Sequence, residues 1–91
     1  MRGSIVQYMY SQISATAGNV VEVTLDRQAN VRLMDSYNYR RFQNGQTHQF
    51  YGGTAQVSPV RIAVPSSGTW YVVIDLGSAG GSIRHSVRVI A

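Results

Sequence analysis

The chain has 91 residues and a formal net charge of +4, which comes from eight arginines and no lysine set against four acids. This length is enough for one domain with a single core. The chain has no cysteine, which excludes a disulfide framework and a thiolate metal site. The lack of cysteine leaves the redox compartment open, and a cytoplasmic location is the default expectation. No segment approaches the roughly 20 consecutive apolar residues that span a bilayer, so we expect no membrane span.

Short runs rich in Val, Ile and Tyr alternate with turn residues along the chain. There are 12 Val and 6 Ile but only 3 Leu, and β-branched side chains favour a pleated sheet over a helix. The runs recur every 8 to 12 residues or so, which is typical of an all-β sandwich or barrel. We therefore predict one antiparallel β-sandwich, jelly-roll-like, of seven or eight strands over residues 1–91. The expected strands, in chain order, are 4–13, 19–26, 30–35, 38–43, 47–52, 58–64, 69–76 and 82–90.

The first four residues, MRGS, resemble the remnant of an expression vector and are given no functional weight. In the strands that follow, apolar and polar side chains alternate, which predicts one buried and one outward face. Residues 65–68, Pro-Ser-Ser-Gly, are expected to form the turn between two of these strands. The predicted inward residues are Val21, Val23, Leu25, Val31, Leu33, Val60, Ile62, Val64, Trp70, Val72, Ile74, Leu76, Ile83, Val87 and Val89.

Four arginines fall on outward positions of three predicted strands: Arg32, Arg61, Arg84 and Arg88. They form a single patch if their strands are neighbours in one sheet, and they are scattered if the strands belong to two sheets. The planar guanidinium fork suits carboxylates and phosphates, so a shared patch would favour an anionic ligand. Alternatively, arginine stems shield apolar neighbours and their charges protect sheet edges. Strand order decides between these alternatives, and the sequence leaves it open.

Residues 35–53, DSYNYRRFQNGQTHQFYGG, concentrate aromatic rings and arginine. Such rings can stack on bases or sugars while arginine pairs with phosphates. Asn44–Gly45 is also a strong hairpin-turn signal, and aromatic pairs across a hairpin stabilise it. We therefore predict an aromatic hairpin that can serve as a binding platform. The candidate ligand- or partner-binding residues are Tyr37, Tyr39, Arg40, Arg41 and Tyr51 in this segment, with Arg61, Arg84 and Arg88 elsewhere.

The sequence offers little for catalysis. Two histidines, His48 and His85, lie 37 positions apart without any cysteine, which does not make a zinc site, and the dispersed acids do not suggest a calcium site. His85 is expected as a hydrogen-bonded imidazole on the inward side of the last strand, and His48 as a hairpin or solvent residue. The glycine-rich residues 77–82 have no lysine and no helix after them, so they are not a phosphate loop. We predict no enzyme activity, no cofactor and no metal.

Three segments carry a resemblance to a known family. VVEVTLDRQANVRLMDSYNY (20–39), FYGGTAQVSPVRIAVPSSGTWYVVIDLG (50–77) and HSVRVI (85–90) resemble an uncharacterised bacterial family of small domains that is labelled only as a domain of unknown function. The resemblance covers roughly residues 5–90. It implies a β-sandwich that occurs alone or beside TIR-type signalling domains, and it brings no catalytic residues.

Two classes of function follow from the sequence. The first is a non-enzymatic interaction module that docks on a protein or self-associates into a homo-oligomer, through an outward Arg/Tyr face or a sheet edge. The alternative is a module that binds an anionic glycan or nucleic acid with the aromatic and arginine hairpin. The first is favoured because nucleic-acid binders usually carry denser positive charge.

Overall fold

A computed structural model of the chain describes residues 8–77 and 81–91. Within these residues the predicted antiparallel β-sandwich is confirmed, with seven strands and one short helix. The elements are β1 (Met9–Ala15), β2 (Val20–Leu25), β3 (Ala29–Asp35), α1 (Ser36–Gln43), β4 (Tyr51–Ala55), β5 (Val60–Ala63), β6 (Gly68–Asp75) and β7 (His85–Ile90).

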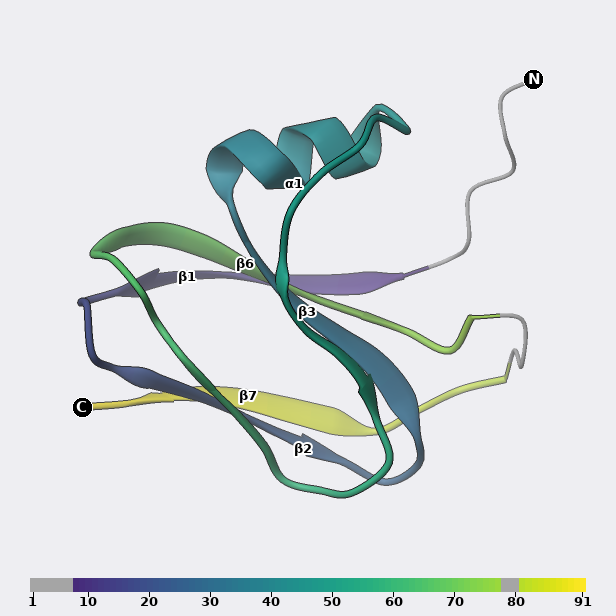
Figure 1. Ribbon diagram of the computed structural model, residues 1–91. Coiled ribbons are helices and arrows are strands. Elements are labelled where there is room, and N and C mark those ends of the chain that lie inside the picture. Colours follow the sequence, from purple (N-terminus) through teal and green to yellow (C-terminus); the bar gives the residue numbers. More distant parts are fainter. Residues whose placement is uncertain (1–7, 78–80) are drawn as a thin grey trace.

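The strands form two antiparallel sheets. The larger sheet has the order β1-β6-β3-β4 and the smaller one β5-β2-β7. Helix α1 packs against the outer face of the larger sheet, so the molecule has three layers, with α1, the larger sheet and the smaller sheet following one another from top to bottom (Figure 1). The outer faces of the two outer layers therefore point in opposite directions.

The main core lies between the two sheets and consists mainly of the predicted inward side chains, joined by Ala15 and Ala29, which were not predicted. Val21, Val23, Val31, Leu33 and Val72 are fully buried there. Burying a side chain of this size contributes roughly 1.5 to 3 kcal/mol, which makes this layer the main source of stability. The period-two alternation is thus confirmed for these strands. Val89 differs, because it is exposed near the end of β7, an edge strand.

The predicted strand 38–43 and the predicted hairpin around Asn44–Gly45 are wrong, because residues 36–43 form α1. The carboxylate of Asp35 accepts a hydrogen bond from the backbone N–H of Asn38 and caps the start of the helix. At the other end Gly45 takes a positive φ of 71°. Its N–H donates to the carbonyl of Phe42 and the N–H of Gln46 to that of Arg41, which is the usual glycine-ended helix terminus.

Other strand boundaries shift by a few residues. Because α1 and its terminus extend to residue 46, the chain needs residues 46–50 to return to the larger sheet, and β4 covers 51–55 instead of the predicted 47–52. The first strand covers 9–15 instead of 4–13, of which residues 4–7 lie outside the described part, as do residues 78–80 of the glycine-rich segment. The last strand begins at residue 85 instead of 82.

Candidate functional site

An aromatic cluster joins α1 to the outer face of the larger sheet. The ring of Tyr39 lies parallel to that of Tyr71, with centroids 4.1 Å apart and an interplanar angle of 7°. Met34 and Val73, on outward positions of β3 and β6, are buried beneath it. Tyr39 itself is only 6% exposed. Burial, and the hydroxyl of Tyr8 at 3.4 Å, raise the pKa of the Tyr39 hydroxyl well above its ordinary value. Tyr39, predicted as a contact residue, therefore packs the helix onto the sheet.

Three other candidate residues lie on α1. Tyr37 is exposed, and the guanidinium of Arg41 lies 5.6 Å from the centre of its ring. The Nε of Arg41 donates to the carbonyl of Thr47. Arg40 and Arg41 occupy the last turn of α1, where cations interact favourably with the helix dipole. These arginines thus have a structural role at the end of the helix, whatever else they contact.

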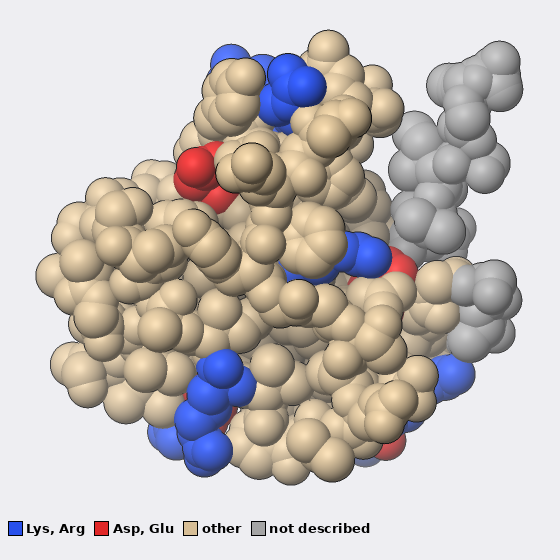
Figure 2. All heavy atoms as spheres, viewed as in Figure 1, with Lys and Arg blue, Asp and Glu red and all other residues tan. Residues whose placement is uncertain are grey.

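The strand order disperses the four outward arginines. Arg61 on β5 and Arg88 on β7 both face Glu22 on the central strand of the smaller sheet, with Nε–oxygen distances of 3.0 Å and 2.6 Å. Arg88, and then Arg61, lower the pKa of the Glu22 carboxyl below its ordinary value. Arg32 belongs to the other sheet, and Arg84 lies in the loop before β7. Figure 2 agrees, because the basic side chains on the face shown lie in separate groups.

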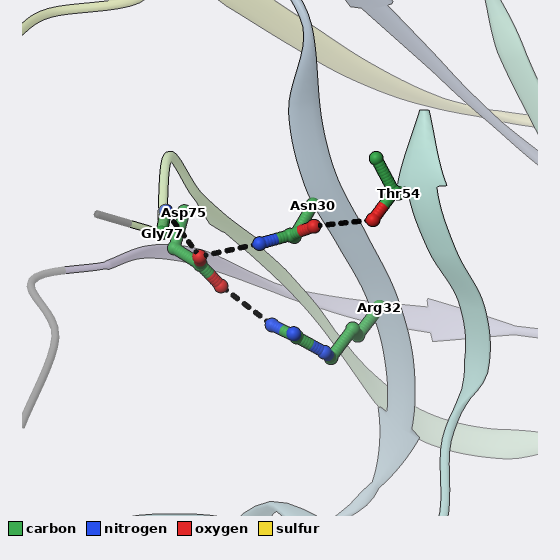
Figure 3. Close-up of polar contacts among 5 residues, drawn as sticks. All are labelled: Asn30, Arg32, Thr54, Asp75 and Gly77. Atoms are coloured by element: carbon green, nitrogen blue, oxygen red, sulfur yellow. Dashed lines mark hydrogen bonds and ion pairs between the residues drawn. The ribbon is translucent and has the colours of Figure 1, made fainter. Parts of the chain in front are cut away.

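Asp75, at the end of β6, is a buried carboxylate on the outer face of the larger sheet. It accepts hydrogen bonds from the Nδ2 of Asn30 at 2.9 Å and from the backbone N–H of Gly77 at 2.8 Å, and it pairs with Arg32 (Figure 3). Asn30 also accepts a hydrogen bond from the hydroxyl of Thr54. Burial alone would raise the pKa of Asp75, but these partners outweigh it and hold the pKa below its ordinary value.

All four carboxylates of the chain thus have partners within the fold. Besides Glu22 and Asp75, Asp26 accepts the backbone N–H of Arg84 at 3.0 Å, and Asp35 accepts two hydrogen bonds from Asn38. Over residues 8–77 and 81–91, no three His, Cys, Asp or Glu side chains gather closely enough to hold a metal ion. The same residues contain no helix of the length and apolarity needed to cross a membrane.

The two histidines occupy different surroundings. His48 lies beside α1, with its ring 5.2 Å from that of Phe42 and its Nδ1 2.9 Å from the carbonyl oxygen of Gln46. His85 pairs with Leu25 on the inward face of β7, as the alternation predicted. It is half-buried and not a core residue, and no hydrogen bond to its ring is found among the described residues.

A cleft of about 390 Å³ opens where β3 leads into α1. Tyr51 is the one predicted candidate that lines it, and its ring centre lies 6.1 Å from that of Trp70. None of the other lining residues was predicted as a binding residue, although Leu33 and Trp70 were predicted to point inward. The polar Asp35, two positions after the inward Leu33, is the signal that could have located this end of the sandwich. The cleft is lined by Leu33, Asp35, Asn38, Gln49, Phe50, Tyr51 and Trp70.

Comparison with known proteins places the chain in a family. The model of the family described as "Domain of unknown function (DUF1883)" matches residues 6–91, and the chain belongs to this family. No curated protein and no solved structure matches the chain.

Proposed function

We propose that this domain is a non-enzymatic interaction module that associates with a second copy of itself through the free edge of β1. The sequence offered two surfaces for such a role, an Arg/Tyr face and a sheet edge. An Arg/Tyr face would have to unite the side chains of α1 with Arg61 and Arg88. Those two groups lie on the opposite outer layers of the molecule, so the edge is the better supported surface.

The contrast between β1 and the other edge strands carries this proposal. Among the described residues the edges are β1, β4, β5 and β7, and β1 is the longest with seven residues. Charged side chains and distortions commonly protect sheet edges from pairing with other chains. Arg61 lies on β5, Arg88 on β7 and the pair Gly52–Gly53 on β4. The sequence of β1, MYSQISA, contains no charge, no proline and no glycine.

A two-fold axis beside β1 would pair this strand with its copy. In such an isologous contact the same surface is used twice, and the two strands run antiparallel. The midpoint of β1 is Gln12, so the two Gln12 side chains would lie near the axis. The two larger sheets would then become one continuous sheet held by main-chain hydrogen bonds. Since β1 is uncharged, no like charges would meet.

The absence of catalysis is supported by the use of the acidic groups. Each of Glu22, Asp26, Asp35 and Asp75 accepts a hydrogen bond within the fold. Among the described residues, the cleft that Asp35 lines contains no second acid and no histidine, so no acid–base pair meets there. The alternative of an anionic glycan or nucleic acid has less support. Its platform was the hairpin at residues 35–53, which contains a helix instead. Glu22 also offsets one of the two positive charges of Arg61 and Arg88.

The family resemblance suggests a cellular context for this interaction module. We infer a bacterial, cytoplasmic protein in which the domain stands alone or beside a TIR-type signalling domain. Pairing through β1 would then bring the attached domains of two chains together.

Sedimentation velocity over a range of protein concentrations tests the proposal. The unchanged protein should form a dimer that dissociates on dilution. Gln12→Lys should weaken the dimer by at least about tenfold, because it places two like charges at the axis. Thr24→Lys is the matched control, since Thr24 is exposed on the central strand of the smaller sheet.

Variants with opposite charges at position 12 test whether β1 of one copy contacts β1 of the other. Gln12→Lys and Gln12→Glu should each be monomeric alone, whereas an equal mixture should associate. A purely monomeric wild type at the highest concentration would refute the proposal. A Gln12→Lys protein that dimerises like Thr24→Lys would do the same, because it would move the interface away from β1.

A further inference from the structure

The cleft at the start of α1 combines a polar wall with an aromatic wall. Leu33 pairs with Tyr51 and Asp35 with Trp70 in the register of the larger sheet, so these four side chains share its inner face. Asn38 on α1 and the returning residues 49–50 complete the lining. The volume of about 390 Å³ falls in the range of roughly 300 to 1,000 Å³ that small-molecule sites usually have.

The polar wall is held in place by hydrogen bonds that use only part of its capacity. Asp35 Oδ1 accepts from the backbone N–H of Asn38 at 2.8 Å and from Asn38 Nδ2 at 3.0 Å. Asn38 Oδ1 accepts from the backbone N–H of Gln49 at 2.8 Å. Asp35 Oδ2, the second N–H of Asn38 Nδ2 and the side-chain amide of Gln49 stand outside these bonds. The wall therefore offers a fixed acceptor and several donors, which is the complement of a hydroxyl group.

The aromatic wall presents ring surface at the same place. Tyr51 and Phe50 are 46% and 42% exposed. Trp70 is only 5% exposed, and its indole N–H donates to the carbonyl of Ser66. It therefore belongs to the aromatic wall as a buried ring held in a fixed position. An exposed ring packs well against the flat C–H face of a pyranose, while polar groups beside it pair with the hydroxyls.

The charges around the cleft disfavour both kinds of ion. No Lys, Arg or His is among the described residues that line it, so an anion would find no partner of opposite charge there. A cation is disfavoured for two reasons. The guanidinium of Arg32 already lies over the ring of Phe50, 5.2 Å from its centre, and the start of α1 offsets the charge of Asp35. A neutral ligand rich in hydroxyl groups meets neither of these unfavourable charge effects.

We propose that this cleft binds a neutral sugar unit of one or two rings. The sugar stacks on Tyr51 and exchanges hydrogen bonds with Asp35, Asn38 and Gln49. This site is separate from the β1 edge, so it concerns a ligand of the domain and not its self-association.

Trp70 makes the test direct, because it is the sole tryptophan of the chain and forms part of the cleft. We would titrate the protein with glucose, galactose, mannose, N-acetylglucosamine, cellobiose and lactose. Tryptophan fluorescence and the ¹H–¹⁵N NMR spectrum would be followed in each titration. At least one of these sugars should give a saturable change, with the largest amide shifts at Asn38, Gln49 and Tyr51. Glucuronate and tetramethylammonium should leave those amides unshifted.

Variants distinguish this site from any other. Tyr51→Ala and Gln49→Ala should each weaken binding of the responding sugar by about tenfold. Tyr37→Ala and Gln43→Ala, exposed residues of the same types outside the cleft, should bind like the unchanged protein. The NMR spectrum of each variant shows whether it is folded, and Gln49→Ala removes only an exposed side chain.

Three results would overturn the inference. One is the lack of a saturable response to every neutral sugar tested. Another is a stronger response to glucuronate or tetramethylammonium, which would assign an ionic ligand. The third is unchanged affinity in both Tyr51→Ala and Gln49→Ala, which would place the sugar elsewhere. Sedimentation measures β1 pairing independently, so either proposal can fail alone.

Discussion

Tyr39 of α1 and Tyr71 of β6 stack face to face, 4.1 Å apart between ring centres and within 7° of parallel. These residues are 32 positions apart in the sequence, and their contact is the centre of the layer that joins the helix to the larger sheet. Phe42 extends the same layer, with its ring 6.2 Å from that of Tyr39.

Removing the ring of Tyr39 tests how much this layer contributes. Tyr39→Ala should lower the free energy of unfolding by about 3 kcal/mol, because it leaves a cavity above Met34 and Val73. Tyr39→Phe keeps the stack and should cost about 1 kcal/mol for the lost hydroxyl contact with Tyr8. Urea unfolding measures both. Exposed Tyr37→Ala is the control, and an equal effect at both positions would contradict the assigned role.

The partners of Asp75 predict the effect of neutralising this carboxylate. Asp75→Asn should lower the free energy of unfolding by about 2 kcal/mol, since Arg32 would lose its partner while keeping part of its exposure to water. Ser86→Asn, an exposed change in β7, should be close to neutral. Thermal or urea unfolding measures the free energy of unfolding of both variants. Equal losses in Asp75→Asn and Ser86→Asn would contradict the stabilising role of the contacts that Asp75 makes.

Acid should destabilise the domain through Asp75 and Glu22. Their pKa values in the folded protein lie below the ordinary values of 3.8 and 4.5, so the folded state binds these protons more weakly than the unfolded state. The stability that they contribute is complete above those ordinary values and is lost as the pH falls through the lower, folded-state pKa values. Urea unfolding between about pH 6 and pH 3 should therefore show a decline that begins at about pH 4.5. Asp75→Asn should decline less steeply; an identical slope would exclude Asp75 as a source.

The two glycines of β4 should respond differently to the same substitution. Both have positive φ, 110° at Gly52 and 146° at Gly53. A Cβ at Gly52 would overlap the carbonyl oxygen of Val31, whereas one at Gly53 meets open space. Gly52→Ala should cost about 3 kcal/mol, and Gly53→Ala about 1 kcal/mol for the backbone conformation alone. Chemical denaturation measures the loss of stability in both variants. A larger loss in Gly53→Ala than in Gly52→Ala would contradict the close approach of β3 and β4.

The strands that alternate strictly were predictable from the sequence. Val21, Val23 and Val72 point into the core as expected, because period-two burial follows directly from strand geometry. The outer face of the larger sheet was less predictable. Met34 and Val73 are apolar at outward positions, and such residues signal that another layer covers the face.

Helix α1 was missed because its signals also suit a hairpin. Asn44–Gly45 supplies the positive φ that either a hairpin turn or a helix end requires. Asp35 as a cap and the three-residue spacing of Tyr39 and Phe42 favour a helix, but aromatic residues have modest helix propensity. Packing against Tyr71 outweighs that propensity, and this partner is far away in the sequence.

The candidate sites depended on strand order, which local patterns do not contain. The alternation correctly placed Arg61 and Arg88 on outward positions, yet only the order β5-β2-β7 brings both to Glu22. The same order separates them from Arg32. Trp70 and Asp35 likewise meet at the cleft only through the pairing of β3 with β6.

Among the residues that the structure describes, the layer beneath α1 shares no side chain with the core between the two sheets. We therefore expect α1 to detach from the larger sheet by local unfolding while the two sheets stay folded. Amide protons of α1 would then exchange with deuterium sooner than those of β6. Each such opening would briefly expose the apolar side chains of Met34 and Val73, which the packed helix shields from water.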